Sequence, residues 1–465
     1  MKKVLYFLTG GILFATQLLA NNILVDNANL SGKNTSTHTT NVTFDVSWEN
    51  SWRTSTNESN YDGAWIFVKY RKNGTNDWRH ATITSATGAT GAATQVPADG
   101  KGIFIYRDAD GIGNVNFTGN TLLWNYGADG LLDNETVEIR VFALEMVYIP
   151  AGSFYLGSGG TENYSFRDGN TTNPYLVSSN DPIPLGNSAT GMLNPNGLGA
   201  LSGDIPSAFP KGYNAIWTMK YECSQQQFVD FLNHLDLARA NANNVNPIFT
   251  GTHPNLVAPA PDKAMNGLGF LRTSAFADWS GLRPMSELEF EKICRGHNNP
   301  AVPNEYVWGN TSIVQVNAIN NNAMPDESVN TPVAANANIG SMLPYTTRVG
   351  IFARTSGSTR ELSGGTYYGV MNMGDNVSEV CFSMATADGL AIDASVHGDG
   401  YLDAAGSSDI SEWTKYQAYG ARGGAYNTVI DQGRISERLY SNYFSSYAYD
   451  VNTSTNGFRL VRSAL

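Results

Sequence analysis

Charged side chains are scarce in this chain, and positive charge is scarcer than negative charge. Only 15% of the 465 residues are charged, and 41 acidic residues outnumber 29 basic ones, which gives a formal net charge of −12. A nucleic-acid partner requires a basic surface that neutralises phosphates, so this composition argues against nucleic acid. Asn, Ser, Thr and Gly take the place of the missing charges. The composition therefore predicts a neutral-polar, loop-rich chain.

Cysteine and histidine are also few, which limits the chemistry open to the chain. Cys223, Cys294 and Cys381 stand in apolar surroundings, and no CxxC or Cys/His spacing indicates zinc. We interpret them as buried small hydrophobic residues; a disulfide between two of them is the alternative, and its partners do not follow from the sequence. The six histidines are scattered, and no Gly-x-Ser-x-Gly elbow stands in a suitable strand-to-helix context. The sequence therefore predicts a protein without catalytic residues.

Long apolar runs are missing after the N-terminus. Two lysines precede an apolar run over residues 4–19, and Leu-Leu-Ala precedes Asn21. We interpret 1–20 as a signal peptide; a retained N-terminal anchor is the alternative, although the run is short and interrupted by glycine. No cysteine directly follows Ala20, which disfavours a lipoprotein. We expect a mature chain that is secreted or held at the cell surface, without a membrane span.

Residues 21–143 carry strand patterns. Asn73-Gly74 supplies a turn signal between two of the patterned segments. Several short strands with turn residues between them predict a β-sandwich domain over 21–143. The joint near 143–146 is short, so we expect this domain to pack against the rest of the chain. The segments rich in β-branched and aromatic residues are 41–48, 64–70, 78–83, 102–107 and 135–142.

Regular structure is sparser in the second predicted domain, residues 144–465. Ser224 with Gln227, and Ser286 with Glu289, each have the spacing of a capping box, which predicts a short helix after each serine. Long segments rich in Gly, Asn, Ser and Pro separate the patterned stretches. The whole chain is thus expected to be α+β and loop-rich. The predicted helices cover 228–235 and 288–294.

Six motifs in the second domain keep the order of one known family. The last is a frame in two parts, Arg-Gly-Gly-Ala-Tyr at 422–426 and Asn-Gly-Phe-Arg-Leu-Val at 456–461. Together the motifs resemble the formylglycine-generating enzyme family, also called the sulfatase-modifying factor family. The resemblance implies a fold similar to that of C-type lectins. The other five motifs lie at 146–154, 219–225, 281–291, 305–309 and 369–379.

The resemblance also implies two catalytic cysteines shortly after the Gly-Gly pair, and this chain lacks them. Alignment on Gly423-Gly424 places Thr428 and Gly433 at those positions. A hydroxyl and a bare backbone replace neither a thiolate nucleophile nor a copper ligand. We therefore expect a catalytically inactive member of an enzyme family. A residual formylglycine-generating oxidase is an alternative.

A structural calcium site is a further implication of the resemblance. Asn372 and Glu379 would offer side-chain oxygens, and Asp375 and Val377 would offer backbone carbonyls. A set of hard oxygen ligands suits calcium. The alternative is a turn in which Glu379 pairs with an arginine. The family's second calcium site is doubtful here, because Gly350 stands where an aspartate is expected.

Two other acidic turns are compared with calcium-binding loops. Asp108 and Asp110 precede Gly111 at a spacing seen in calcium loops, but the downstream glutamate of such a loop is absent. An Asp-Gly pair is also an ordinary turn, which is the favoured interpretation. The segment 397–400 has a single carboxylate and is interpreted as a turn.

Residues 434–455, between the two parts of the frame, are rich in Tyr, Ser, Asn and Asp. Tyrosine gives contact area at low entropic cost, and small polar residues give adaptable hydrogen bonds, as in antibody paratopes. Diversity-generating retroelements vary this place in lectin-like proteins of the family, so the resemblance implies a diversified binding face. A polar surface loop over a Tyr-rich core is the alternative. The predicted ligand-binding residues are Tyr440, Asn442, Tyr443, Tyr447, Tyr449 and Asn452.

The leading functional prediction is a secreted, non-catalytic binding or surface-interaction protein. Its expected partner is a protein or glycan ligand at the cell surface, contacted by the C-terminal face. The alternative is a structural component of a cell-surface assembly, such as a filament or gliding apparatus, which associates with itself through the edges of the β-sandwich.

Overall fold

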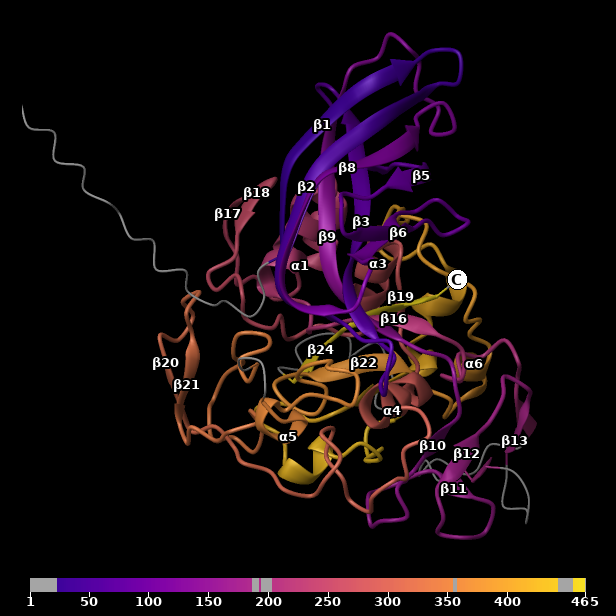
Figure 1. Cartoon of the computed structure of the whole chain (residues 1–465), viewed down its shortest axis with the longest axis vertical. Coiled ribbons are helices and arrows are strands. Elements are labelled where there is room, and N and C mark those ends of the chain that lie inside the picture. The colour runs from indigo at the N-terminus through magenta and orange to yellow at the C-terminus, as the bar shows by residue number, and fades with distance from the viewer. Residues whose placement is uncertain (1–22, 186–191, 194–202, 354–357, 442–454, 465) are drawn as a thin grey trace, which may run out of the picture.

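The computed structural model describes residues 23–185, 192–193, 203–353, 358–441 and 455–464 (Figure 1). Strands outnumber helices, and the helices are short. The N-terminal strands extend from one end of the molecule, and the loop-rich remainder forms the other end. Among the described residues, no helix has the length and apolar character needed to cross a membrane.

The N-terminal region is built from strands, as its sequence pattern predicts. Along β2 the side chains alternate between buried and half-exposed, because successive residues of a strand point to opposite faces. The strands are β1 (Leu24–Asn34), β2 (Thr39–Arg53), β3 (Tyr61–Lys72), β4 (Arg79–His80), β5 (Ile83–Thr87), β6 (Ala92–Gln95), β7 (Ile103–Arg107), β8 (Gly111–Asn125) and β9 (Val137–Ile149).

These strands do not form a sheet of their own. They belong to a twelve-stranded sheet that includes β16 (Ile216–Met219) and β25 (Leu460–Ser463) from the C-terminal region. Strand β9 pairs with β3 from Val137 to Tyr148, and its last four residues, Met146 to Ile149, also pair with β16. The predicted domain boundary between 143 and 144 therefore falls inside one continuous strand, and backbone pairing joins the two regions.

The N-terminal strands enclose a core between two layers. One layer contains β1, β2, β8 and β5, and the other contains β9, β3, β7 and β6. The layers meet through a single β2–β3 pair, Arg53 with Tyr61. This layering resembles the predicted sandwich, but both layers are parts of the large sheet.

Strand β3 is buried on both faces. Ile66 and Val68 pack into the N-terminal core, whereas Trp65 and Phe67 pack into the core of the C-terminal region. A strand covered on both faces has a nearly continuous apolar sequence rather than a strict alternation. The predicted packing of the two regions is thus achieved through β3.

A buried ion cluster also joins the two regions. The Nζ atom of Lys220 lies 3.1 Å from a carboxylate oxygen of Asp62 and 3.1 Å from one of Glu145. All three side chains are buried, and Asp62 also accepts a hydrogen bond from the indole of Trp48. Removing one partner of such a cluster leaves an uncompensated buried charge, so the cluster depends on all three residues.

The C-terminal region combines short helices with small sheets. Its helices are α1 (Gln225–Asn233), α2 (Leu237–Asn243), α3 (Phe270–Ser280), α4 (Glu287–Arg295), α5 (Arg360–Ser363) and α6 (Ala387–Leu390), with 3₁₀ turns at Ser411–Thr414, Tyr416–Ala418 and Ile430–Gly433. Its remaining strands are β10 (Phe154–Leu156), β11 (Arg167–Asp168), β12 (Tyr175–Val177), β13 (Ile183–Leu185), β14 (Met192–Leu193), β15 (Gly203–Ile205), β17 (Thr250–Thr252), β18 (Asn255–Val257), β19 (Arg283–Pro284), β20 (Ala318–Asn320), β21 (Ser328–Thr331), β22 (Ser378–Phe382), β23 (Tyr419–Arg422) and β24 (Asn456–Gly457).

The two predicted helices are α1 and α4, and both start at their capping boxes. The Ser224 hydroxyl accepts a hydrogen bond from the Gln227 N–H, and the Ser286 hydroxyl accepts one from the Glu289 N–H. Helix α3 was not predicted. Its N-cap, Gly269, makes no side-chain capping bond, so the sequence carries no start signal for this helix.

Candidate functional site

The two positions aligned with catalytic cysteines are occupied by structural contacts. The Thr428 hydroxyl accepts a hydrogen bond from the Ala425 N–H (2.9 Å) and donates one to the Ala425 carbonyl (3.1 Å), which closes a turn. Gly433 packs against the backbone of Gly374: an added Cβ would lie 2.6 Å from the Gly374 carbonyl oxygen. A side chain larger than hydrogen has no room at position 433 without a backbone shift.

The three cysteines lie in the core. Cys223, Cys294 and Cys381 are free and buried, which confirms their interpretation as small core residues; none of them forms a disulfide. Burial raises the pKa of each thiol well above its usual range, because a low-dielectric surrounding disfavours the thiolate. The thiolate is the reactive form, so these residues are poor nucleophiles.

The predicted calcium residues lie together at the start of β22. Asn372 donates to the carboxylate of Asp375 at 3.2 Å, and its own side-chain oxygen accepts a hydrogen bond from the Gly350 N–H at 2.8 Å. Glu379 forms an ion pair with Arg459 at 3.0 Å, as in the arginine-paired alternative. Its second oxygen, Oε2, is buried and accepts no hydrogen bond from the described part of the chain.

Acidic side chains outnumber basic ones around this group. Glu222, Asp375 and Glu379 are fully buried, and Arg459 is the guanidinium that stabilises their charged forms. Burial raises the pKa of Asp375 to about 7 and that of Glu379 to about 8, and raises the pKa of Glu222 well above its usual range. A hard cation would compensate this excess and occupy the open Glu379 oxygen. Glu379 Oε2 is thus an open donor for a cation here, whereas the Asn372 oxygen is bonded to the Gly350 N–H.

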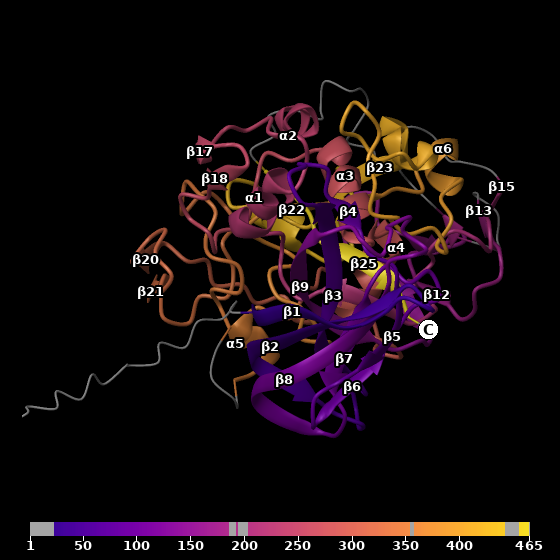
Figure 2. The same ribbon diagram turned by 90° about the horizontal axis from the view of Figure 1, so that it is seen from above.

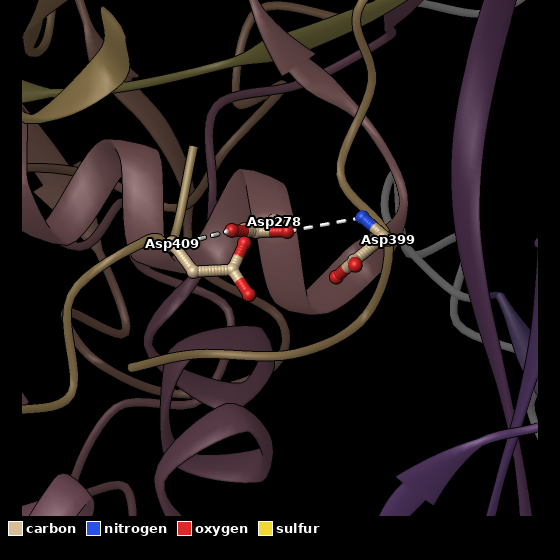
Figure 3. Close-up of side chains that lie close together, drawn as sticks. All are labelled: Asp278, Asp399 and Asp409. Carbon is tan, nitrogen blue, oxygen red and sulfur yellow. Dashed lines mark hydrogen bonds between the residues drawn. The ribbon is translucent and has the colours of Figure 1, made fainter. Parts of the chain in front are cut away.

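A second acidic group joins α3 to a distant loop. Asp278, Asp399 and Asp409 each bring a carboxylate oxygen to within 4.8 Å of the others, and the three could hold a metal ion (Figure 3). Asp278 is buried, whereas Asp399 and Asp409 reach solvent. The sequence pattern of 397–400 indicated only a turn.

The Asp278 carboxylate is already well bonded. One of its oxygens accepts from the Asp399 N–H (3.0 Å), and the other accepts from the Ser408 hydroxyl (2.6 Å) and the Asp409 N–H (3.2 Å). Burial raises its pKa to about 7, and the charges of Asp399 and Asp409 add to the effect. Lys69 lies nearby and donates a hydrogen bond to the Gly400 carbonyl at 2.9 Å, and burial lowers the pKa of its amine well below the usual range.

The acidic turn before Gly111 forms an ordinary contact. The Asp110 carboxylate accepts hydrogen bonds from the backbone N–H and the hydroxyl of Ser55, at 3.0 and 2.6 Å. These bonds fasten the turn to the neighbouring loop, as the favoured turn interpretation expects.

The Tyr-rich segment leaves and re-enters one small sheet, β23-β22-β24. At the N-terminal end of the segment, the Tyr440 carbonyl accepts a hydrogen bond from the Ala421 N–H of β23. At its C-terminal end, the Thr455 carbonyl accepts one from the Ser378 N–H of β22. Tyr440 itself is half-buried. The other predicted ligand-binding residues, Asn442, Tyr443, Tyr447, Tyr449 and Asn452, lie outside the described residues.

Buried ion pairs hold the N-terminal end of the Tyr-rich segment in place. Arg438 contacts the carboxylate of Glu287 on α4 at 2.7 and 3.0 Å, and its guanidinium lies 3.7 Å from the centre of the Phe166 ring. Arg422 of β23 pairs with Glu287 and Glu291 at 3.2 and 2.9 Å. Helix α4 therefore fixes the sheet and the approach to the Tyr-rich segment together.

Comparison with known families agrees with this architecture. Residues 135–464 match the model of the FGE-sulfatase family, described as a sulfatase-modifying factor enzyme 1-like domain. The match begins two residues before β9, the strand that the two regions share. No curated protein matches the chain significantly. Because the match covers more than half of the sequence, the chain belongs to the FGE-sulfatase family, whose domain is of the sulfatase-modifying factor enzyme 1 type.

Proposed function

We propose that this protein is a secreted, non-catalytic binding protein of the FGE-sulfatase family. Its Tyr-rich segment would contact a protein or glycan at the cell surface. The observation that best supports this proposal is the anchoring of both ends of 442–454 on one buried sheet. Segments that connect rigid elements commonly carry binding residues, because the scaffold positions them while their sequence varies.

The absence of a usable cysteine supports the non-catalytic part of the proposal. The three thiols are buried and held in the protonated form. Position 433 has no space for a side chain, and the Thr428 hydroxyl is committed to a turn. The copper and thiolate chemistry that the family resemblance implies therefore has no set of side chains to support it among the described residues.

Calcium is proposed as a structural ion at the Asn372–Glu379 group. Glu379 and Asn372 would hold it through side-chain oxygens, and Asp375 and Val377 through backbone carbonyls. The ion would neutralise the buried carboxylates, and the unpaired Glu379 oxygen supports this assignment. An added Cβ at Gly423 would lie 2.7 Å from that oxygen, so the ion would also stabilise the C-terminal frame next to it.

A structural role in a cell-surface assembly is the second candidate. Strand β1 pairs only with β2 among the described strands, and Leu24 and Leu30 on it are exposed. An exposed edge strand with apolar side chains is a template for pairing with another chain. Sedimentation of the purified protein separates the two candidates: a monomer favours ligand binding, whereas ordered polymers favour the assembly.

Alanine replacement of two segment tyrosines tests the binding proposal. The labelled mature chain is expected to bind the surface of the cells that produce it, and Tyr443→Ala/Tyr447→Ala should abolish that binding. Interface aromatics each contribute about 2 kcal/mol or more, so loss of two should lower the affinity by roughly several hundred-fold or more. The melting temperature should stay unchanged.

A variant of the anchoring residue Arg438 supplies the control. Arg438→Gln breaks the buried pair with Glu287 and should lower the melting temperature, because the remaining carboxylate loses its main hydrogen-bond donor. If the tyrosine pair unfolds the protein as Arg438→Gln does, those tyrosines belong to the core. Unchanged cell binding by a folded tyrosine variant would also contradict the proposal.

A further inference from the structure

A cleft lies between the N-terminal strands and two helices of the C-terminal region. Figure 2 shows α1 and α3 beside β9 and β3. The cleft consists of two cavities, of about 510 and 430 Å³. Trp78, His234 and Trp279 line both of them, so the cavities adjoin each other at these three side chains. Each volume is in the range of small-molecule sites.

Aromatic rings form the wall that the cavities share. The Trp78 ring meets His234 at 4.8 Å between centroids, His234 meets Phe142 at 4.9 Å, and Phe142 meets Trp279 at 5.1 Å. All three contacts are edge-to-face. Trp78 is only half-buried and lies in the loop between β3 and β4. A half-exposed tryptophan at the junction of two cavities is a feature of ligand sites, since tryptophan gives a large contact area.

Hydrogen-bonding groups are mixed into this wall. The Nδ1 atom of His234 lies 2.7 Å from the Asp230 carbonyl oxygen, which can only accept, so Nδ1 carries the hydrogen and Nε2 is an acceptor. Burial lowers the pKa of His234 to about 4, so the ring is neutral at physiological pH. The Trp279 indole N–H is buried and has no acceptor within the described residues.

Opposite charges face the larger cavity. Asp230 and Arg140 line it; burial raises the pKa of the Asp230 carboxyl to about 6, while the bond from Gln226 and the guanidinium of Arg140 favour its charged form. Gln226 donates to one Asp230 oxygen at 3.0 Å. Arg140 donates no side-chain hydrogen bond to any residue in the described ranges, whereas its neighbour Arg71 is paired with Glu138 at 2.6 Å. Besides the paired Arg71, the larger cavity therefore presents Arg140 as a basic group and Asp230 as an acidic group.

These observations restrict the class of ligand. A purely apolar ligand would cover Arg140 and Asp230 without replacing their bonds to water, which costs free energy. An anion would meet Asp230, and a cation would meet Arg140. A hydroxyl group both donates and accepts, so it satisfies a guanidinium, a carboxylate and an imidazole nitrogen in turn. The face of a sugar ring that carries C–H groups also packs against an aromatic side chain.

We propose that this cleft binds a neutral oligosaccharide with one sugar ring in each cavity. Trp78 would lie at the junction of the two rings, and Arg140, Asp230 and His234 would bond the hydroxyls in the larger cavity. None of the residues named for this cleft belongs to 434–455, so the site adds to the proposed function and does not depend on it.

Calorimetric titration of the mature protein with cellohexaose, maltohexaose, chitohexaose and mannohexaose tests this inference. At least one of these neutral probes is expected to bind. Trp78→Ala should weaken that binding at least tenfold, and Arg140→Gln should weaken it several-fold. Arg167→Gln is the matched control, because Arg167 lies on β11 and lines neither cavity. Its dissociation constant should equal that of the native protein.

Three results would overturn the inference: no binding of any probe at millimolar concentration, native affinity in folded Trp78→Ala, or equal losses in Arg140→Gln and Arg167→Gln. Arg140 is exposed, so Arg140→Gln keeps the test valid even if Trp78→Ala does not fold. The Tyr443→Ala/Tyr447→Ala protein should bind the oligosaccharide normally. Its behaviour distinguishes failure of this site from failure of the cell-binding proposal.

Discussion

Replacement of Gly433 by cysteine restores the residue that the family alignment expects, and we predict that it destabilises the protein. The new Cβ would lie 2.6 Å from the Gly374 carbonyl oxygen and 3.2 Å from Cδ1 of Ile339, whereas ordinary contacts are 3.4–4 Å. The nearer atom belongs to the backbone and has no rotamer with which to move aside. Overpacking of this kind costs about 1–3 kcal/mol.

The expected loss is measurable as a change in melting temperature. A cost of 1–3 kcal/mol corresponds to a fall of roughly 2–8 °C in a domain of a few hundred residues. Gly365→Cys is the matched control, since its nearest neighbours are side-chain atoms at 3.4 and 3.5 Å. That variant should melt within about 1 °C of the native protein. An unchanged melting temperature in Gly433→Cys would refute the reasoning, because position 433 would then have room for a catalytic side chain.

Two further predictions concern ions and pH. Calcium should raise the melting temperature of the native protein and of Asp278→Asn, but not of Glu379→Gln. The reason is that a ligand that binds only the folded state stabilises it. A response that is lost in Asp278→Asn and kept in Glu379→Gln would place the ion at the Asp278 group instead. Burial lowers the pKa of His234 from 6.5 to about 4, so the unfolded chain takes up a proton first as pH falls below 6.5, and stability is lost between pH 6.5 and 4. In urea unfolding, His234→Gln should lose about 2 kcal/mol less than the native protein between pH 7 and 4.5, and equal losses would contradict this pKa shift.

Local signals explain what could be predicted of the fold. Helices α1 and α4 follow from Ser224 and Ser286, because a capping box is complete within four residues of sequence. Helix α3 starts at a glycine without a capping side chain and is buried on nearly every side, so neither cap nor amphipathic periodicity marks it. Its formation depends on the surrounding core rather than on its own sequence.

The continuous sheet depends on contacts between distant residues. The sequence predicts that 135–142 is the last strand of one domain and that 146–154 is the first motif of the next. They form the single strand β9 because β3, more than 60 residues earlier, pairs with both halves of it. Strand register over such a separation is set by tertiary burial, which a single sequence does not reveal.

The candidate sites show the same limit. The Asn372–Glu379 residues are close in sequence, so a family motif could identify them together. Asp278 and Asp399 are 121 positions apart, and the cleft combines Trp78 from an N-terminal loop with His234 next to α1. Such residues meet only after the two regions pack together, and no spacing rule connects them.

The central claim is that this chain keeps the fold of an enzyme family without its oxidase activity. Incubation of the purified protein with a sulfatase-type cysteine peptide, with and without copper, tests that claim most directly. Mass spectrometry is expected to show the peptide with its cysteine unchanged in both conditions. Formation of formylglycine that is lost in Cys223→Ser, Cys294→Ser or Cys381→Ser would contradict the claim and identify the nucleophile.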